Sequence, residues 1–240
     1  MARSLSANFS VTGVQIVNDA LRCIGAISQG ENPTGTEVTD GRRALNMMMK
    51  TWMGGQNEFA PGIKMWQRGQ SAIDPSSAKI SYTIAPASAD LTLVVPVAIP
   101  AMNAKDSDGN ETKLEPMTLE EYFKISNKTN TGIPSKFCYE RGYDIGTVYF
   151  DLFLSDDTYT FPFVYLREIY EIDDADDDID FPVHWYEALK YHLAIRLAPE
   201  YGKVVSQDLK DLANLTLAQA QTFYPEETPY EDLYFQPGKD

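Results

Sequence analysis

The sequence predicts an α+β protein: an antiparallel bundle of four main helices, an inserted antiparallel β domain and an extended C-terminal tail. Three observations support this fold class. Apolar residues recur with helical spacing in residues 1–60 and again in residues 182–224. Between them, residues 61–181 change to the period of two that is typical of strands. Residues 225–240 are acidic, interrupted by prolines and too few to fold alone. We therefore expect both chain ends to build one helical domain.

The two N-terminal helices are expected at Thr12–Ile24 and Thr36–Met53. Thr12 and Gln15 have the spacing of a capping box, in which two residues satisfy each other's backbone N–H groups. Glycines follow both helices and favour their ends there. An apolar stripe on the second helix predicts a buried face; its members are Val38, Leu45, Met48, Met49 and Trp52.

Five stretches rich in β-branched and aromatic residues are expected to be strands. They are Lys79–Ile84, Leu91–Val95, Lys136–Glu140, Thr147–Leu154 and Tyr159–Leu166. Pro162 has no N–H to donate, so it indicates an edge strand or a bulge. A short helix is expected at Thr118–Lys124, because Thr118 and Glu121 match a second capping box.

The third and fourth main helices are expected at Pro182–Ala198 and Val205–Phe223. Pro182 suits a first helical turn, where its missing N–H costs little, and the aspartates before it favour the positive helix end. The apolar face of the third helix holds Trp185, Ala188, Leu189, Leu193 and Ile195. That of the fourth holds Val205, Leu209, Leu212, Thr216, Ala220 and Phe223.

Composition limits the functions that this chain can have. Its formal net charge of −15 argues against binding free nucleic acid, which needs a basic surface. The same charge suits solubility, or a wall past which DNA slides without sticking. No apolar run approaches the roughly 20 residues of a membrane span. Cys23 and Cys138 are expected to be small buried residues in a reducing compartment, without a disulfide.

No catalytic residue, cofactor-binding residue or metal ligand can be assigned. The sequence holds no Gly-rich phosphate loop, no nucleophile elbow and no CxxC pair. The Asp106–Asn110 stretch fails as a calcium loop, since Glu111 and Met117 occupy the positions that need Gly and Glu, and a hairpin turn is favoured. The acidic run Glu171–Asp180 is interpreted as a solvated linker in preference to a cation site.

Three polar residues on the third helix need separate treatment. His184 and His192 lie near its apolar half, but no HExxH pattern accompanies them, so a metal or acid–base role is not favoured. Arg196 falls on the apolar face between Leu189 and Trp185, where an unpaired charge costs several kcal/mol. Two interpretations stay open for Arg196: an ion pair within the chain, or a contact with a neighbouring subunit.

The order of four segments resembles the head-to-tail adaptor proteins of short-tailed bacteriophages, also called head-completion, tail accessory or tail tubular A-like proteins. The four segments are Asn18–Gly25, Ala44–Trp52, Ile125–Pro134 and Phe181–Leu189, the last continuing through Leu197–Gly202. The resemblance spans most of residues 10–224, although the β region is longer than in the smallest family members.

This resemblance implies a structural protein of the virion, assembled in the host cytoplasm and located at the portal vertex. It implies a homo-oligomeric ring, expected to be a dodecamer, that extends the DNA channel, helps retain the genome and carries the tail. DNA would pass without sequence-specific binding, and neither cofactor nor membrane is implied. The family's portal contact maps to the tail, whose anchors would be Tyr230, Leu233, Tyr234 and Phe235.

Two other functions are compatible with the sequence. A phage-borne peptidoglycan hydrolase would use a carboxylate pair in the β region, which any acidic protein offers. A tail-tube component would contact the nozzle or tail hub instead of the portal, and the sequence does not separate it from the portal-bound ring.

Overall fold

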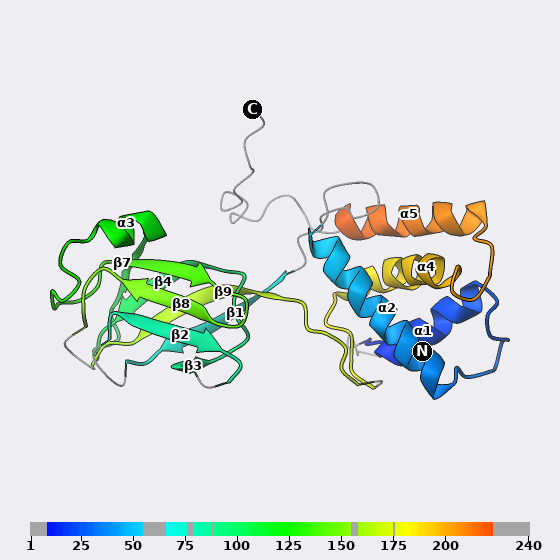
Figure 1. The fold of residues 1–240 in the computed structure, drawn as a ribbon, viewed down its shortest axis with the longest axis horizontal. Coiled ribbons are helices and arrows are strands. Elements are labelled where there is room, and N and C mark those ends of the chain that lie inside the picture. Colours follow the sequence, from blue (N-terminus) through cyan, green and yellow to red (C-terminus); the bar gives the residue numbers. More distant parts are fainter. Residues whose placement is uncertain are drawn as a thin grey trace, which may run out of the picture. The chain divides into compact units, whose positions relative to one another are not determined.

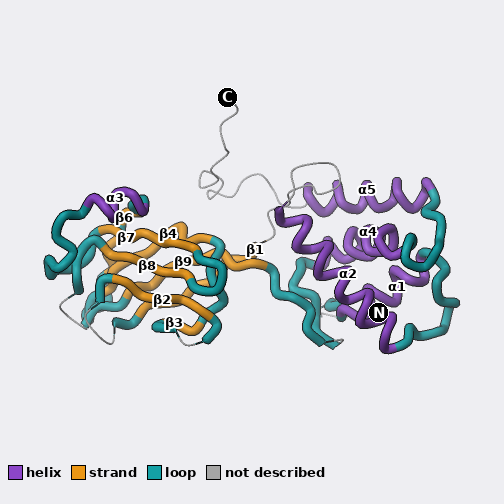
Figure 2. Tube along the Cα trace, in the orientation of Figure 1, coloured by secondary structure: helices purple, strands orange, loops and turns teal. Residues whose placement is uncertain are grey.

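The computed structural model describes residues 9–54, 66–75, 79–87, 89–154, 158–174 and 176–222. It confirms an α+β fold with helices and two β-sheets (Figures 1 and 2). The chain divides into two compact units, one from Met1–Met65 with Ile169–Asp240 and one from Trp66–Glu168. Each unit has its own hydrophobic core.

The helical unit contains α1 (Gly13–Cys23), α2 (Gly35–Gly54), α4 (Tyr186–Leu197) and α5 (Gln207–Thr222). Helix α4 lies in the middle and packs against the other three (Figure 1). Its buried side chains include Ala188, Leu189 and Leu193, as predicted. A helix that contacts three others needs a wide apolar surface, and these residues provide it.

The predicted capping box of α1 is present. The Thr12 side chain accepts a hydrogen bond from the Gln15 backbone at 3.4 Å, and the Gln15 side chain accepts one from Thr12 N at 3.0 Å. The stripe on α2 is also largely confirmed, since Leu45, Met48 and Trp52 are buried. These local signals are strong because each is complete within one or two helical turns.

Two details of the C-terminal helices differ from the prediction. The third helix starts with a 3-10 turn, η1 (Val183–Trp185), before the α-helix begins at Tyr186. On α5 the buried face holds Ala213, Thr216 and Ala220, whereas Leu212 is exposed. The Leu212 assignment was wrong because the small Ala213, which contributes little to a hydrophobicity pattern, occupies the contact with α4.

The acids of the acidic run are mostly exposed, as expected for a solvated linker, but the run is not a free linker, because it packs against the helices. Ile172, Ile179 and Phe181 alternate with the acids and are buried in the helical core. The Asp177 carboxylate accepts hydrogen bonds from the backbone N–H groups of Asp173 and Asp174, at 3.0 and 2.7 Å. Residues 169–181, which the sequence analysis gave to the β domain, therefore pack with the helices.

This segment is also joined to the start of the chain. Gly13 N donates to Asp177 O at 3.0 Å, and Ile179 N donates to Val11 O at 3.2 Å. The Asp180 carboxylate accepts a hydrogen bond from Tyr170 N at 2.9 Å. The backbone ladder and the buried isoleucines together hold the acids in place despite their mutual repulsion.

The second unit is a sandwich of two sheets. One sheet has the order β1-β9-β4-β5 and the other β3-β2-β8-β7-β6. Their strands are β1 (Trp66–Ile73), β2 (Ser81–Ala85), β3 (Leu91–Thr92), β4 (Ala98–Lys105), β5 (Glu111–Lys113), β6 (Glu115–Pro116), β7 (Lys136–Arg141), β8 (Gly146–Phe150) and β9 (Phe161–Glu168). Aromatic side chains from both sheets meet between them, for example Phe150 and Phe161 with ring centres 4.6 Å apart. The predicted short helix is α3 (Leu119–Lys124), with its capping box.

The predicted antiparallel β domain needs correction, because the five-stranded sheet is mixed. Strands β2 and β3 are parallel, as are β6 and β7. Strands β1 and β4 were not predicted, since glycine, glutamines and alanines give them weak β patterns. Pro162 was expected at an edge or a bulge, but it lies in the central strand β9. It falls between two β4 pairs, Lys105 with Thr160 and Met102 with Phe163, so its missing N–H interrupts the β4 ladder at one position only.

Two further contacts stabilise the sandwich. The predicted hairpin turn at Asp106–Asn110 is present, with the Asp106 carboxylate accepting from Asp108 N and Asn110 N at 3.0 and 2.8 Å. The Tyr139 hydroxyl donates to Pro96 O at 2.7 Å, tying β7 to the segment before β4. Burial raises the pKa of Tyr139 to about 12, so this hydroxyl stays protonated and keeps donating.

Candidate interaction surfaces

The residues predicted to bind a partner fall in two places. Tyr230, Leu233, Tyr234 and Phe235 lie outside the described residues, beyond the end of α5. Arg196 lies in the last turn of α4, inside the helical unit. The structure therefore gives a geometry for the Arg196 candidate alone.

Arg196 is a half-buried cation without a carboxylate partner in the described part of the chain. No hydrogen bond or ion pair joins its guanidinium to another described residue, and burial lowers its pKa. The interpretation of Arg196 as one half of an ion pair within the chain thus finds no partner in the described ranges. A carboxylate from elsewhere would lower the electrostatic cost of this position.

His192 lies one turn before Arg196 on α4. Its ring packs edge-on against Trp52 of α2, with centres 5.1 Å apart, and its Nε2 has no hydrogen-bond partner among the described residues. Burial lowers the pKa of His192, and the nearby Arg196 lowers it further. This histidine is therefore neutral near pH 7 and packs against Trp52 of the helical core.

A shallow groove of about 730 Å³ runs between α2 and the segment Glu171–Asp173. Arg42 donates to the Asp173 backbone carbonyl, and Lys50 forms an ion pair with Glu171 at 3.2 Å. The groove thus mixes both charge signs and neutralises most of them internally. It favours neither an anionic nor a cationic ligand.

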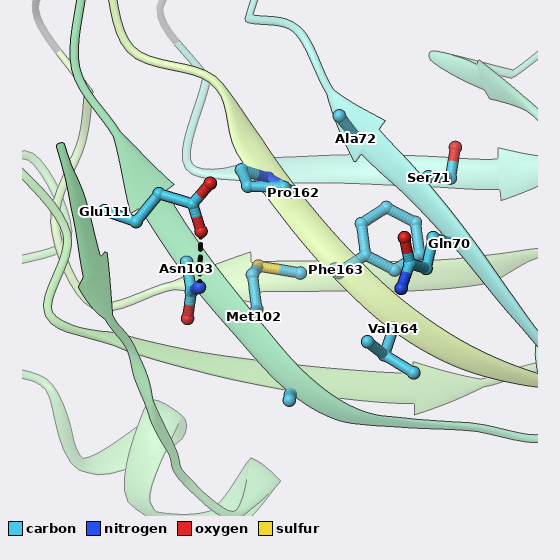
Figure 3. A pocket seen from close by; sticks show the side chains of 10 residues that line it. Gln70, Ser71, Ala72, Met102, Asn103, Glu111, Pro162, Phe163 and Val164 are labelled. Atoms are coloured by element: carbon cyan, nitrogen blue, oxygen red, sulfur yellow. Dashed lines mark hydrogen bonds between the residues drawn. The ribbon is translucent and has the colours of Figure 1, made fainter. Parts of the chain in front are cut away.

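A second hollow, of about 530 Å³, lies on the outer face of the four-stranded sheet (Figure 3). Small side chains form its floor, including Ala72 of β1, Ala101 of β4 and Val164 of β9. Asn103 and Glu111, joined by a hydrogen bond of 2.8 Å, lie at its β5 side. A small apolar floor beside polar groups suits contact with apolar side chains of another polypeptide.

Within the described ranges, no three His, Cys, Asp or Glu residues are grouped so that they could hold a metal ion. Cys138 is buried on β7, as predicted, but Cys23, the last residue of α1, is exposed. Both are free thiols, and burial raises their pKa values, which disfavours the reactive thiolate.

Comparison of the chain with protein-family models and with curated proteins found no match. No helix in the described ranges is long and apolar enough to cross a lipid bilayer. The sequence analysis missed the hollow on the sheet, because two of the strands that build it were not recognised. A usable signal was the alternation of large and small side chains around Phe161, Pro162, Phe163 and Val164.

Proposed function

We propose that this chain is a structural head-to-tail connector of a short-tailed bacteriophage. In this role a ring of copies, expected to be twelve, docks under the portal protein, extends the DNA channel and helps to retain packaged DNA. It also provides the platform for the next tail protein. The protein acts without catalysis or cofactor, is assembled in the host cytoplasm and resides at the portal vertex of the virion.

One observation carries the proposal: helices from both ends of the chain form a single unit, from which the aromatic C-terminal segment continues. A scaffold of this kind leaves a terminal peptide available to a partner while keeping its own core closed. Tyr230, Leu233, Tyr234 and Phe235 are the anchors in the extended tail. Each tail binds weakly alone, but repetition around a ring multiplies the affinity.

The net charge of −15 is consistent with a channel component. Negative walls repel the phosphate backbone, so DNA slides through without sequence-specific adhesion. The β unit, with its exposed loops, is the proposed platform for the downstream nozzle or tail-hub protein.

Deletion of residues 226–240 tests the portal contact. The truncated chain should lose binding to the purified cognate portal, because the proposed anchors are gone, while circular dichroism stays unchanged. Native mass spectrometry of the chain alone and with portal measures both binding and subunit number. Tyr143→Ala is the matched control, since it removes an aromatic side chain that is 98% exposed outside the tail.

Undiminished binding of the truncated chain to the portal would overturn the tail assignment. Repeating the mixture with the nozzle protein in place of the portal separates the portal-bound ring from a tail-tube component. A zymogram on peptidoglycan with the intact chain tests the hydrolase alternative, because clearing of the gel is incompatible with a purely structural role.

Arg196 is the proposed contact between neighbouring subunits, where it meets a carboxylate of the next copy. Arg196→Met should weaken ring assembly on the portal, yet leave the free subunit as stable as before or more stable by about 1 kcal/mol. Arg43→Met, which removes an exposed cation, is the control. Unchanged assembly together with a destabilised subunit would show that Arg196 acts only within its own chain.

A further inference from the structure

Strand β1 is the one long sheet edge among the described strands. It has eight residues, whereas the other edge strands, β3, β5 and β6, have two, three and two. From Gly69 to Ile73, the described residues make no backbone hydrogen bond besides those to β9. Every second residue of this stretch therefore presents its N–H and C=O groups away from the sheet.

The stretch Gly69–Ile73 lacks the devices that usually protect an edge from pairing. It contains no proline and no charged residue, and its pairing with β9 is regular, without a bulge. Sheet edges without such devices are templates for an added strand.

The absence of charge also indicates which partner suits this stretch. The chain carries a net charge of −15, so two copies repel each other wherever their acidic surfaces meet. A two-fold axis through the edge of β1 places Gly69–Ile73 against the same stretch of a second copy. Two copies can therefore approach each other here without opposing like charges.

The stretch is complementary to itself in size as well. When the strands of two copies pair antiparallel with Ser71 opposite Ser71, each serine hydroxyl can donate to or accept from the other. In this register Gln70 of each copy lies opposite Ala72 of the other, and Gly69 lies opposite Ile73. Each of these cross-strand pairs joins a large side chain to a small residue, which avoids crowding.

The outer face beside β1 has room for the side chain that this register brings to it. Gln70 is exposed, and Ala72 borders the hollow of about 530 Å³ described above (Figure 3). Ala72 pairs with Pro162 of β9, and both lie low on this face. The Gln70 side chain of the second copy, opposite Ala72, would extend over this apolar floor.

We propose that the free protein pairs with a second copy of itself through β1, so that two four-stranded sheets form one antiparallel sheet of eight strands. The inference goes beyond the adaptor role, since it concerns the protein before it meets a portal. The contact is short compared with a permanent dimer interface, so monomer and dimer are in equilibrium.

Sedimentation equilibrium of the full-length protein tests the pairing. Between about 1 and about 200 μM, the range of a weak dimer, the mean mass should rise from one chain towards two. A two-fold pair is closed, so the mass should not exceed two chains. A mass of one chain throughout overturns the proposal, as does growth beyond two chains.

A charge variant places the contact on β1. In the proposed register the two copies of residue 70 are diagonal neighbours, about 7–8 Å apart, so Gln70→Glu opposes two carboxylates and should weaken dimerisation at least about tenfold. Thr112→Glu, at an exposed position of β5 on the opposite edge of the same sheet, is the matched control. It adds the same charge to the chain and should leave the dimerisation constant unchanged. A dimer that resists Gln70→Glu, or an equal loss in both variants, overturns the proposal.

Hydrogen exchange followed by mass spectrometry provides a second readout. Amides in Gly69–Ile73 should exchange more slowly at the high protein concentration than at the low one, and amides in Glu111–Lys113 should exchange alike at both. Equal exchange of Gly69–Ile73 at the two concentrations overturns the proposal.

A chain ending at Thr222 separates this contact from any made by the C-terminal tail. Both cores consist of residues before Thr222, so the shorter chain retains its fold. It should dimerise as well as the full-length protein, and loss of the dimer on truncation overturns the proposal. Portal is absent throughout, so the outcome is independent of the portal-binding experiment.

Discussion

At Gly41 the helices α1 and α2 approach so closely that a side chain does not fit. A Cβ atom built at Gly41 would lie 2.4 Å from Val17 Cγ1, well inside van der Waals contact. Both residues are buried, so neither can move into solvent. Gly41→Ala should therefore lower the free energy of unfolding by about 1–3 kcal/mol, which outweighs the gain of about 0.5–1 kcal/mol from better helix propensity.

Urea unfolding in a double-mutant cycle checks this reason. The Gly41→Ala penalty should shrink in a Val17→Ala background, because the clashing methyl groups are gone. Gly35→Ala is the control, since a Cβ at Gly35 meets nothing within 4 Å. A penalty that stays undiminished in the Val17→Ala background would mean that the close approach is not the cause.

His192 makes stability depend on pH at the residue scale. Burial and Arg196 lower its folded pKa below the ordinary value of 6.5, so the unfolded chain binds a proton first as pH falls. Its contribution is fully present above pH 6.5, and it is lost as pH falls from there towards the folded pKa. Urea unfolding between pH 7.5 and about 5 should show this loss, and His192→Gln should reduce it. His184→Gln separates the contribution of His184, whose pKa burial also lowers.

At the scale of an element, the acidic run is a segment that packs against the helical unit. The Asp177 carboxylate holds two backbone N–H groups, while Asp176 is exposed and makes no described hydrogen bond. Asp177→Ala should cost about 1–2 kcal/mol, because two donors lose their acceptor. Asp176→Ala should be neutral or slightly stabilising, since it relieves repulsion among the acids. Thermal unfolding of the two variants compares them, and equal stabilities would return the run to the status of a linker.

Elements whose sequence motif lies within a few neighbouring residues were predictable from the sequence. The capping boxes at Thr12 and Thr118 and the hairpin turn at Asp106 are contained within four or five residues, and all three are present. The packing of the acidic run was not predicted, because the burial of Ile172 and Ile179 depends on helices far away in the sequence. Strand β1 was not predicted for a related reason. Gly69 suits this strand because Tyr165 of β9 packs where a side chain would otherwise lie.

The candidate sites, too, were predictable only where a local pattern reveals them. Arg196 could be singled out by its position on a helical wheel, since the period of an α-helix is known in advance. Whether a carboxylate meets it depends on tertiary packing, which no local pattern encodes. The hollow on the outer sheet needs three strands in their correct order, and that order follows from pairing between residues such as Gly69 and Tyr165.

At the scale of the whole molecule, the β unit has the geometry of an inserted domain. Trp66 and Glu168, its first and last residues, are direct partners in the ladder between β1 and β9. Residues opposite each other in an antiparallel pair have Cα atoms about 4.5–5.5 Å apart. The chain thus enters and leaves the sandwich at one place, and each unit closes a core of its own.

This arrangement predicts that the two units fold independently. A fragment of residues 66–168 should be folded, with a cooperative thermal transition and dispersed amide signals in an NMR spectrum. A helical unit in which a linker of about four glycines and serines replaces residues 66–168 should also fold, because the ends to be joined are neighbours. The full-length protein should then unfold as the sum of the two transitions. If either fragment is unfolded while the intact protein is stable, contacts between the units supply the missing free energy, and the β unit is not an autonomous insertion.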